Sequence, residues 1–345
     1  RSSDLCGMSS SSASKPLLIN GVSPSKVGVP ANTQRSALEF LCQRFPAIQR
    51  DVWLQRFNAG WVLNSNGQSI PPNHDLRGAT HLLYFRHIED EPQLPFQAQL
   101  VFQDAYLVVA DKPHFMPVTP GGKYVQQSLL VQLKQQLNLP ELSPIHRIDR
   151  ETAGLVLFSV RAQDRNAYQE LFRHRQVEKT YEAIACAPES SPLKLEFPRI
   201  HKSWMAEDTQ FFRMREQANS LGNSDNPNHP DPSSDSFNSE TWMDCIERFS
   251  ARDAEKPFSH TPAQTFAKYL LKPLTGQRHQ LRVHMNALGL PLLGDQFYPV
   301  VQRGPDEADD FKRPLQLLAK TLSFKDPVTG ESRRFESRQR LVLPS

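Results

Sequence analysis

The sequence predicts an α+β fold, with a small α/β module preceding a larger domain. After residue 98, strand-like and helix-like runs follow one another in irregular order, without the strict alternation of a doubly wound sheet. The length of 345 residues allows roughly two domains. The polar string Glu89–Pro92 is typical of a linker, so we expect the module to cover 16–92 and the larger domain 93–345.

The module is expected to contain two helices and a hairpin. Apolar residues within 36–45 recur at the spacing of one helix face. Ser36, followed three residues later by Glu39, fits a capping box. A second helix is predicted over 48–58, and the Asn-Gly pair within 61–70 predicts a tight hairpin turn there.

The larger domain shows several short apolar runs separated by amphipathic segments. We expect strands at 100–102, 106–110, 154–160 and 177–185, and helices at 128–137 and 162–175. Residues 199–262 form an insertion in this domain. Within it, 217–240 consists mostly of Ser, Asn, Asp, Pro and Gly without Lys or Arg, which predicts disorder.

Charge and composition bound the class of protein. With 40 Lys and Arg against 37 Asp and Glu, the net charge of +3 excludes binding of nucleic acid by bulk charge alone, although 263–298 and 311–345 are locally basic. No apolar run is long enough to cross a membrane. Residues 1–15 lack an apolar signal core and are expected to be a flexible leader. Four scattered cysteines favour a reducing compartment, so we expect a cytoplasmic protein.

The chemically most informative stretch surrounds Asp149. This aspartate lies among His146, Arg147 and Arg150, just before a predicted strand. Adjacent cations favour its ionised form and keep it available as a nucleophile or base. The same residues also fit a surface ion-pair cluster.

A metal site would need other ligands, such as His279 and His284, to join His146 and Asp149. The neighbouring arginines repel a divalent cation. We therefore expect no metal at this position.

This stretch resembles a known family. Residues 146–155, HRIDRETAGL, resemble the H-R-L-D-R-x-T-S/A-G-L motif of the RluA-type pseudouridine synthases in the RluA/RsuA superfamily. Further blocks of the family pattern are matched in order at 111–118, 178–183, 274–284 and 289–298. The resemblance implies a mixed, mostly antiparallel central sheet with flanking helices. It also implies isomerisation of uridine to pseudouridine in rRNA or tRNA by a monomer that needs no cofactor, metal or protein partner.

The resemblance also implies the residues of the site. Asp149 matches the catalytic aspartate, which either attacks C1′ of the ribose or removes a proton from C2′, and the sequence leaves both routes open. Arg282 matches the arginine that pairs with this aspartate. Tyr181 matches the aromatic residue that packs against the target base, and it is also expected to assist removal of the C5 proton. Arg147 matches the arginine that fills the space of the flipped nucleotide. Substrate contacts or support of the catalytic loop are expected from His146, Arg150, Arg278 and His279.

Two alternatives remain at this point. A non-catalytic RNA-binding protein could keep the fold, although Asp149, Tyr181 and Arg282 are all present. A metal-dependent phosphohydrolase is disfavoured because the sequence lacks a cluster of acidic ligands. The helices and hairpin of the first module resemble a divergent S4-like RNA-binding module, which implies a second contact with RNA.

Overall fold

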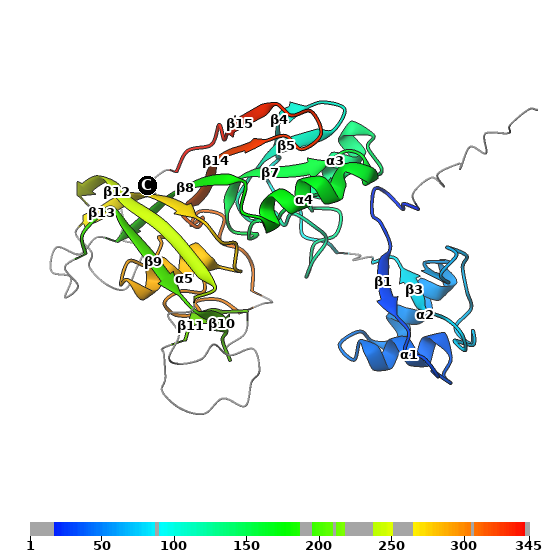
Figure 1. Cartoon of the computed structure of the whole chain (residues 1–345). Coiled ribbons are helices and arrows are strands. Elements are labelled where there is room, and N and C mark those ends of the chain that lie inside the picture. Colours follow the sequence, from blue (N-terminus) through cyan, green and yellow to red (C-terminus); the bar gives the residue numbers. More distant parts are fainter. Residues whose placement is uncertain are drawn as a thin grey trace, which may run out of the picture. The chain divides into compact units, whose positions relative to one another are not determined.

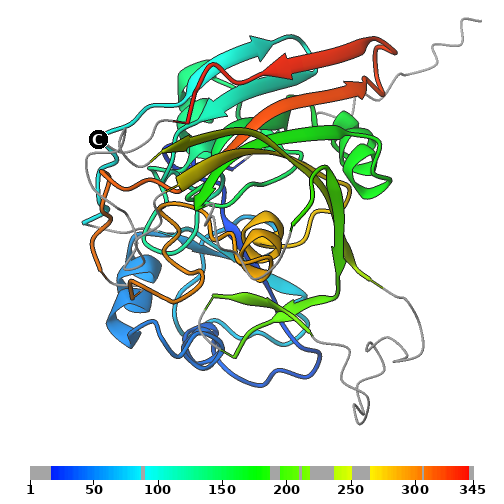
Figure 2. The same cartoon turned by 90° about the vertical axis from the view of Figure 1, so that its left-hand side faces the viewer.

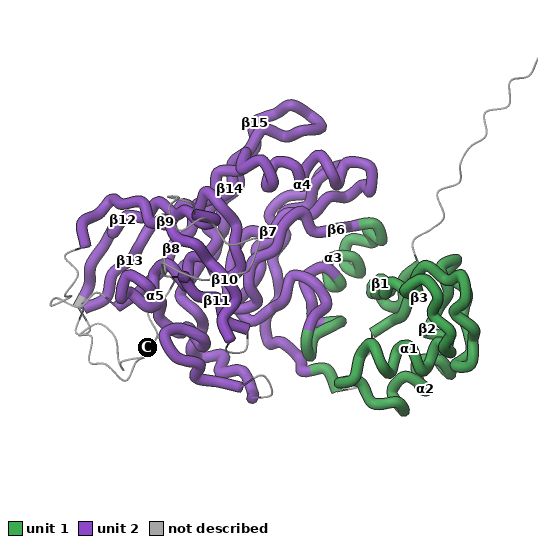
Figure 3. Tube along the Cα trace, turned by 60° about the horizontal axis from the view of Figure 1, so that its bottom comes forward, with its two compact units in different colours: residues 1–91, 122–126, 131–141 green, residues 92–121, 127–130, 142–345 purple. Residues whose placement is uncertain are grey.

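The computed structural model describes residues 17–86, 90–186, 195–209, 212–217, 237–250, 265–304 and 307–341. The leader expected at 1–15 and most of the segment expected to be disordered, 217–240, lie outside the described residues. The chain divides into two compact units, coloured separately in Figure 3. The first comprises 1–91, 122–126 and 131–141, and the second comprises 92–121, 127–130 and 142–345.

Up to residue 91, the described residues of the first unit form a small antiparallel sheet and two helices. The sheet has the order β1-β3-β2, with β1 (Ser25–Gly28), β2 (Val62–Leu63) and β3 (His81–Tyr84). The helices are α1 (Ala37–Arg44) and α2 (Arg50–Asn58), which pack around the fully buried Trp53. Ser36 and Glu39 form the capping box that the sequence predicts, in which each side chain accepts a hydrogen bond from the backbone N–H of the other residue.

A ten-stranded sheet organises the second unit (Figure 1). Its main path runs β4-β5-β7-β14-β8-β13-β12-β9, with β15 paired to β14 and β6 paired to β7. All pairings are antiparallel except that of β7 with β14, which confirms the α+β fold with a mixed, mostly antiparallel sheet. The strands are β4 (Gln99–Gln103), β5 (Leu107–Lys112), β6 (Ser143–Pro144), β7 (Ala153–Ser159), β8 (Glu178–Cys186), β9 (Arg199–Ser203), β12 (Ser239–Ser250), β13 (Thr265–Pro273), β14 (Leu317–Lys325) and β15 (Ser332–Glu336).

Two helices flank this sheet, each over a different half. Helix α4 (Arg165–Arg173), which follows the short 3₁₀ turn η1 (Ala162–Asp164), packs Tyr168 and Leu171 against β5, β7 and β14. Helix α5 (Gln280–Ala287) lies beside the other half of the sheet (Figure 2). Its Leu281 and Met285 pack against β8, β12 and β13. Helix α3 (Leu129–Leu137) occupies the predicted position. No helix among the described residues is long and apolar enough to cross a membrane.

The parallel pair of β7 and β14 depends on a glycine. Gly154 has φ of +111°, and a Cβ placed there would lie 2.3 Å from the carbonyl oxygen of Ala319 on β14. Only glycine allows this approach, because it has no side chain to clash and it adopts positive φ without strain. The close approach fixes the start of β7, and therefore the loop with Asp149 just before it, against the sheet.

The region 199–262 adds strands to the sheet and a hairpin beside it. Strands β9 and β12 extend the sheet, and Ser239 and Glu240 of the segment 217–240 begin β12. Strands β10 (Met205–Glu207) and β11 (Met214–Glu216) form an antiparallel hairpin. Its methionines Met205 and Met214 pack with Val283 of α5, so the hairpin is attached to the helix that carries Arg282.

Candidate active site

The centre of the site is a buried arginine surrounded by carboxylates. Arg282 projects from α5 and is fully buried. Its Nε donates to Asp295 Oδ2 at 2.8 Å, and its Nη2 donates to Asp295 Oδ1 at 2.6 Å. Its Nη1 lies 3.5 Å from Asp149 Oδ2 and 3.8 Å from Glu151 Oε2. The guanidinium therefore lies beside three carboxylates. Asp149 is the one that the sequence predicts as its partner.

The charges of this cluster support one another. Burial alone would lower the pKa of Arg282, but Asp295, Asp149 and Glu151 raise it above its usual value. Burial acts to raise the pKa of Glu151, but the nearby Arg282 and Arg150 outweigh it and hold this pKa below the usual range. A buried arginine without such partners would be strongly unfavourable. Arg282 and its three carboxylates therefore form one ionic cluster.

Of the three carboxylates, Asp149 is the accessible one. Its side chain is 25% exposed, against 8% for Glu151 and 1% for Asp295. Asp149 also lines the pocket beside α5, whereas Glu151 and Asp295 are absent from the pocket wall. Asp149 can therefore contact a substrate while Arg282 lies behind its carboxylate.

Tyr181 of β8 and Lys179, two residues earlier, line the same pocket. Burial and the charge of Asp149 raise the pKa of Tyr181, so its phenol stays protonated at neutral pH. Such a ring is suited to packing against a base and poorly suited to accepting a proton. The Lys179 Nζ donates to the carbonyl of Thr275 at 2.9 Å, and burial lowers the pKa of this lysine to about 8.

The loop with Asp149 is held from behind. Lys112, fully buried at the end of β5, donates to the carbonyl of Arg150 at 3.0 Å, and burial lowers its pKa to about 7. Arg150 itself forms a two-point ion pair with Asp309 at 2.8 and 2.9 Å and contacts Glu151 at 3.0 Å. Because these carboxylates bind the guanidinium of Arg150, this side chain is better placed to support the loop than to contact the substrate.

His146 is also tied into the protein. Its Nε2 accepts a hydrogen bond from the backbone N–H of Leu157 at 3.2 Å, and its ring stacks on Phe172 with centroids 4.5 Å apart. Burial, and to a smaller extent Lys179, lower the pKa of His146 to about 3. The neutral ring therefore joins the loop to β7 and α4.

The depressed pKa of His146 predicts a pH dependence of stability. In the unfolded chain the imidazole takes up a proton near pH 6.5, whereas in the folded protein it stays neutral down to about pH 3. The unfolded state therefore binds more protons in this window, and stability falls as the pH is lowered through it, by up to about 1.4 kcal/mol per pH unit. Replacement by Gln keeps an acceptor for Leu157 without a titrating group. We expect chemical denaturation of His146→Gln between pH 7 and 4 to show a shallower loss of stability, and an unchanged slope would contradict this assignment.

Arg278 and His279, both predicted to bind substrate, lie at the N-terminal end of α5. His279 is buried, and its Nδ1 is 3.0 Å from the hydroxyl of Tyr298. Arg278 is partly exposed, and its Nη2 donates to the carbonyl of Arg213 at 3.3 Å. The side chain of His279 thus contacts buried groups of the protein, and that of Arg278 contacts the hairpin of β10 and β11.

A wide groove of about 970 Å³ leads to Asp149. Asp149 is the one acidic residue among the described residues that line it. Arg147 is exposed there and, among the described residues, makes no hydrogen bond or ion pair. The basic residues of the groove are Arg147, Arg150, Arg173, Arg175, Lys179 and Arg278. Such a surface suits a phosphate backbone.

The family follows from a match over this same region. A family model described as RNA pseudouridylate synthase matches residues 106–287, which carry Asp149, Tyr181 and Arg282. The chain belongs to this family. It is an RluA-type RNA pseudouridine synthase, an enzyme that isomerises uridine in RNA.

Relatives of the synthase cover most of its length. It is 28% identical over 246 residues to the dual-specificity RNA pseudouridine synthase RluA of Salmonella typhi, across 71% of this chain and 94% of the relative. It is 27% identical over 270 residues to an uncharacterized RNA pseudouridine synthase of Synechocystis sp., across 76% and 78%. The solved structure of human RNA pseudouridylate synthase domain containing 1 has the same fold, with a TM-score of 0.51 and 22% identity across 72% of this chain and 86% of the other.

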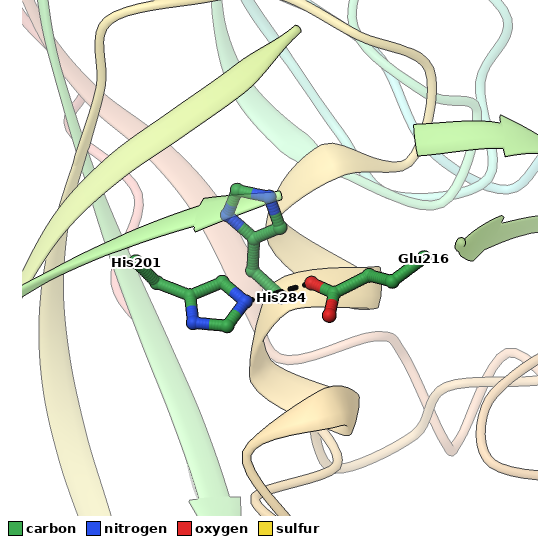
Figure 4. A group of neighbouring side chains, drawn as sticks. All are labelled: His201, Glu216 and His284. Atoms are coloured by element: carbon green, nitrogen blue, oxygen red, sulfur yellow. Dashed lines mark hydrogen bonds and ion pairs between the residues drawn. The ribbon is translucent and has the colours of Figure 1, made fainter. Parts of the chain in front are cut away.

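The synthase also contains a cluster of possible metal ligands away from Asp149. His201 of β9, Glu216 of β11 and His284 of α5 place their ligand atoms within 4.8 Å of one another (Figure 4). His201 Nε2 already contacts Glu216 Oε1 at 2.7 Å, and both nitrogens of His284 contact hydroxyl groups, Nε2 that of Ser239 at 3.0 Å and Nδ1 that of Thr241 at 2.9 Å. These contacts join the inserted strands to α5, and coordination of a metal would have to break several of them.

Sequence reasoning missed several residues of the site. Glu151 and Asp295 share Arg282 with Asp149, and Lys112 fixes the loop from behind. Lys179 carried a usable signal, because residues two apart on a strand point to the same face and Tyr181 was already assigned to the pocket. The roles of Asp295 and Lys112 depend on contacts that local spacing does not encode.

Proposed function

We propose that the synthase acts through Asp149 on the ribose of a uridine flipped out of rRNA or tRNA. One observation carries this assignment: of the three carboxylates around Arg282, Asp149 is the one that lines the pocket. A group that reacts with the substrate must be accessible to it, whereas Asp295 uses both oxygens on the guanidinium. Glu151 and Asp295 then hold the arginine in place.

The isomerisation breaks the N1–C1′ bond, rotates the uracil and joins C5 to C1′. The ionised carboxylate of Asp149 starts it in one of two ways, by attack at C1′ or by removal of the C2′ proton, and both need the charge that Arg282 stabilises. The ring of Tyr181 packs against the uracil. On the first route C5 displaces the carboxylate from C1′, and on the second the proton returns to C2′ as C5 joins C1′. The C5 proton then leaves and N1 takes up a proton, so the product is an isomer of the substrate.

Binding requires the target nucleotide to leave its stack, which costs a few kcal/mol. Arg147 is suited to fill the vacated space, since it is exposed beside Asp149 and has no protein partner among the described residues. The basic side chains of the groove offset the backbone charge of the RNA. Arg278 contributes to this surface, whereas the side chains of His146, Arg150 and His279, which also border the groove or the pocket, are engaged by the protein and support it.

The test of substrate class uses RNA from a strain that lacks the encoding gene. Pseudouridine formation releases the hydrogen from C5, so rRNA and tRNA labelled with 5-tritiated uridine report turnover as tritium in water. We expect tritium release from one of the two pools. The modified uridine is then mapped within that RNA. Absence of release from both pools would overturn the proposed substrate and would favour a non-catalytic RNA-binding protein.

The proposed chemistry needs neither a metal nor an organic cofactor. We expect 1,10-phenanthroline, which binds transition metals without removing the Mg²⁺ that folds RNA, to change the rate of tritium release by less than about twofold. The cluster at His201, Glu216 and His284 makes this a real test, because its His284 lies on α5, the helix with Arg282. A loss of turnover that Zn²⁺ restores would show that the cluster holds a required metal.

We further propose a monomeric, cytoplasmic enzyme whose first unit acts as an S4-like RNA-binding module. The free cysteines Cys42, Cys186 and Cys245 fit a reducing compartment. Sedimentation would give the mass of one 39.3 kDa chain for a monomer. Fractionation of cells tests the compartment, and the affinity of residues 93–345 for RNA, compared with that of the full chain, tests the module.

A further inference from the structure

An exposed aromatic side chain lines the groove far from Asp149 in the sequence. Phe212 lies between β10 and β11 and is 56% exposed, which is unusual for so large an apolar group. It belongs to the same groove wall as Arg278, Arg147 and Asp149. None of the chemistry assigned above uses it.

The hairpin that presents Phe212 is firmly anchored. Tyr298 receives a hydrogen bond from the N–H of Met214 at 2.8 Å and donates one to its carbonyl at 3.2 Å. On the other side, Arg278 Nη2 donates to the carbonyl of Arg213 at 3.3 Å, and its Nη1 lies 3.5 Å from Glu207 Oε1. The position of Phe212 is therefore set by contacts to the base of α5 and to the loop that follows it.

The backbone conformation of Phe212 and the guanidinium near its side chain also indicate that the aromatic ring itself has a role. Phe212 has φ of +62°, a conformation that glycine or asparagine adopts far more readily than a bulky aromatic residue. The Arg278 guanidinium lies 5.8 Å from the ring centroid, a distance compatible with a cation–π contact. A turn residue chosen for conformation alone would not be phenylalanine, and a ring needed for packing would not be exposed.

We propose that Phe212 is a stacking subsite for an unpaired base of the substrate RNA next to the flipped uridine. This inference rests on the proposed function and adds to it a binding determinant for the flanking sequence. Aromatic rings combined with a basic groove are the usual surface for single-stranded RNA, since the cations contact phosphates and the rings stack on bases. The groove offers both, with Phe212 beside its arginines and lysine.

The test compares Phe212→Ala with Phe212→Tyr and Phe212→Trp on a transcript that carries the mapped uridine. Loss of one stacking contact should raise the KM for the transcript by about 10-fold. The Kd for the transcript should rise by the same factor when Phe212→Ala is combined with the inactive Asp149→Asn change, which prevents turnover. The effect should fall on KM, with kcat reduced less than twofold, and both aromatic variants should restore most of the affinity. Ile246→Ala is the matched control, because Ile246 is 48% exposed on β12 and does not line the groove.

Crosslinking gives a readout independent of turnover. RNA with 5-iodouridine beside the target, irradiated on the wild-type protein, should crosslink to the peptide that contains Phe212. Unchanged KM and Kd in Phe212→Ala, or a loss equal to that of Ile246→Ala, would overturn the subsite. Failure of the proposed function is distinguishable, because an inactive wild-type protein that still crosslinks at Phe212 would keep the subsite and remove the catalytic assignment.

Discussion

Replacement of Asp149 by Asn is expected to abolish pseudouridine formation and leave the protein folded. Asn has the same size, but it can neither attack C1′ nor accept the C2′ proton, so we expect a loss of more than about 10³-fold in turnover. Stability should change little, because Asp295 and Glu151 remain to balance Arg282. Tritium release measures the rate, and thermal unfolding by circular dichroism measures the stability.

The control for this change is Asp75→Asn, an aspartate in the first unit that is paired with Arg77 at the surface. It should keep full turnover. Asp149→Asn should also keep its affinity for RNA, because the basic groove remains. A variant that unfolds would show that Asp149 is mainly structural, and one that retains turnover would remove it from the chemistry.

The same assay distinguishes the two routes open to Asp149. Removal of the C2′ proton breaks a C–H bond, so uridine deuterated at C2′ should react more slowly if that step limits the rate. Attack at C1′ leaves the C2′ bond intact and produces an ester between the aspartate and the ribose. Single-turnover kinetics with the deuterated transcript, together with mass spectrometry of the trapped protein, reports on both.

Local patterns predicted those parts of the fold whose residues are apolar and regularly spaced. Strands β5 and β7 each contain a continuous apolar run, and α1 carries its capping signals in the sequence. Strand β12 was missed because its sequence mixes acidic, polar and apolar residues, and it begins within the polar segment 217–240. Pairing with β13 and β9 stabilises this strand, and such pairing between distant segments leaves no local pattern.

A residue of the site could be predicted from the residues around it where its chemical partners stand next to it in the chain. Asp149 stands beside cations in the sequence, whereas Arg282 looks from its residue type like a charge on a helix surface. It is instead fully buried, because Asp295, thirteen residues later, and Glu151, more than a hundred residues earlier, meet it in the fold. Spacing alone does not reveal a buried ion pair, since each partner taken singly resembles a surface residue.

Replacement of Arg282 by Met is expected to be the most destabilising single change in the site. It would leave Asp295 buried without its cation and Glu151 with Arg150 alone, and breaking a buried ion pair in this way typically costs about 3–5 kcal/mol. Turnover should fall as well, because Asp149 loses the guanidinium that lies 3.5 Å from its carboxylate. Chemical denaturation at pH 7 measures the first effect, and tritium release measures the second.

The pH dependence separates this ionic role from simple packing. In the wild type, the pKa of Glu151 is lowered in the folded state, so its contribution to stability is present above the unfolded pKa and is lost as the pH falls through the folded value. In Arg282→Met, Arg150 alone opposes the effect of burial on Glu151, so the pKa of Glu151 in the folded state should rise, and stability should fall less than in the wild type as the pH is lowered from 7 toward 5. Asp295→Asn in the same chain should restore part of the loss at pH 7, whereas Arg77→Met, at an exposed pair, should change little. A loss in Arg282→Met that is independent of pH and of Asp295 would mean that the arginine contributes volume to the core and no charge to Asp149.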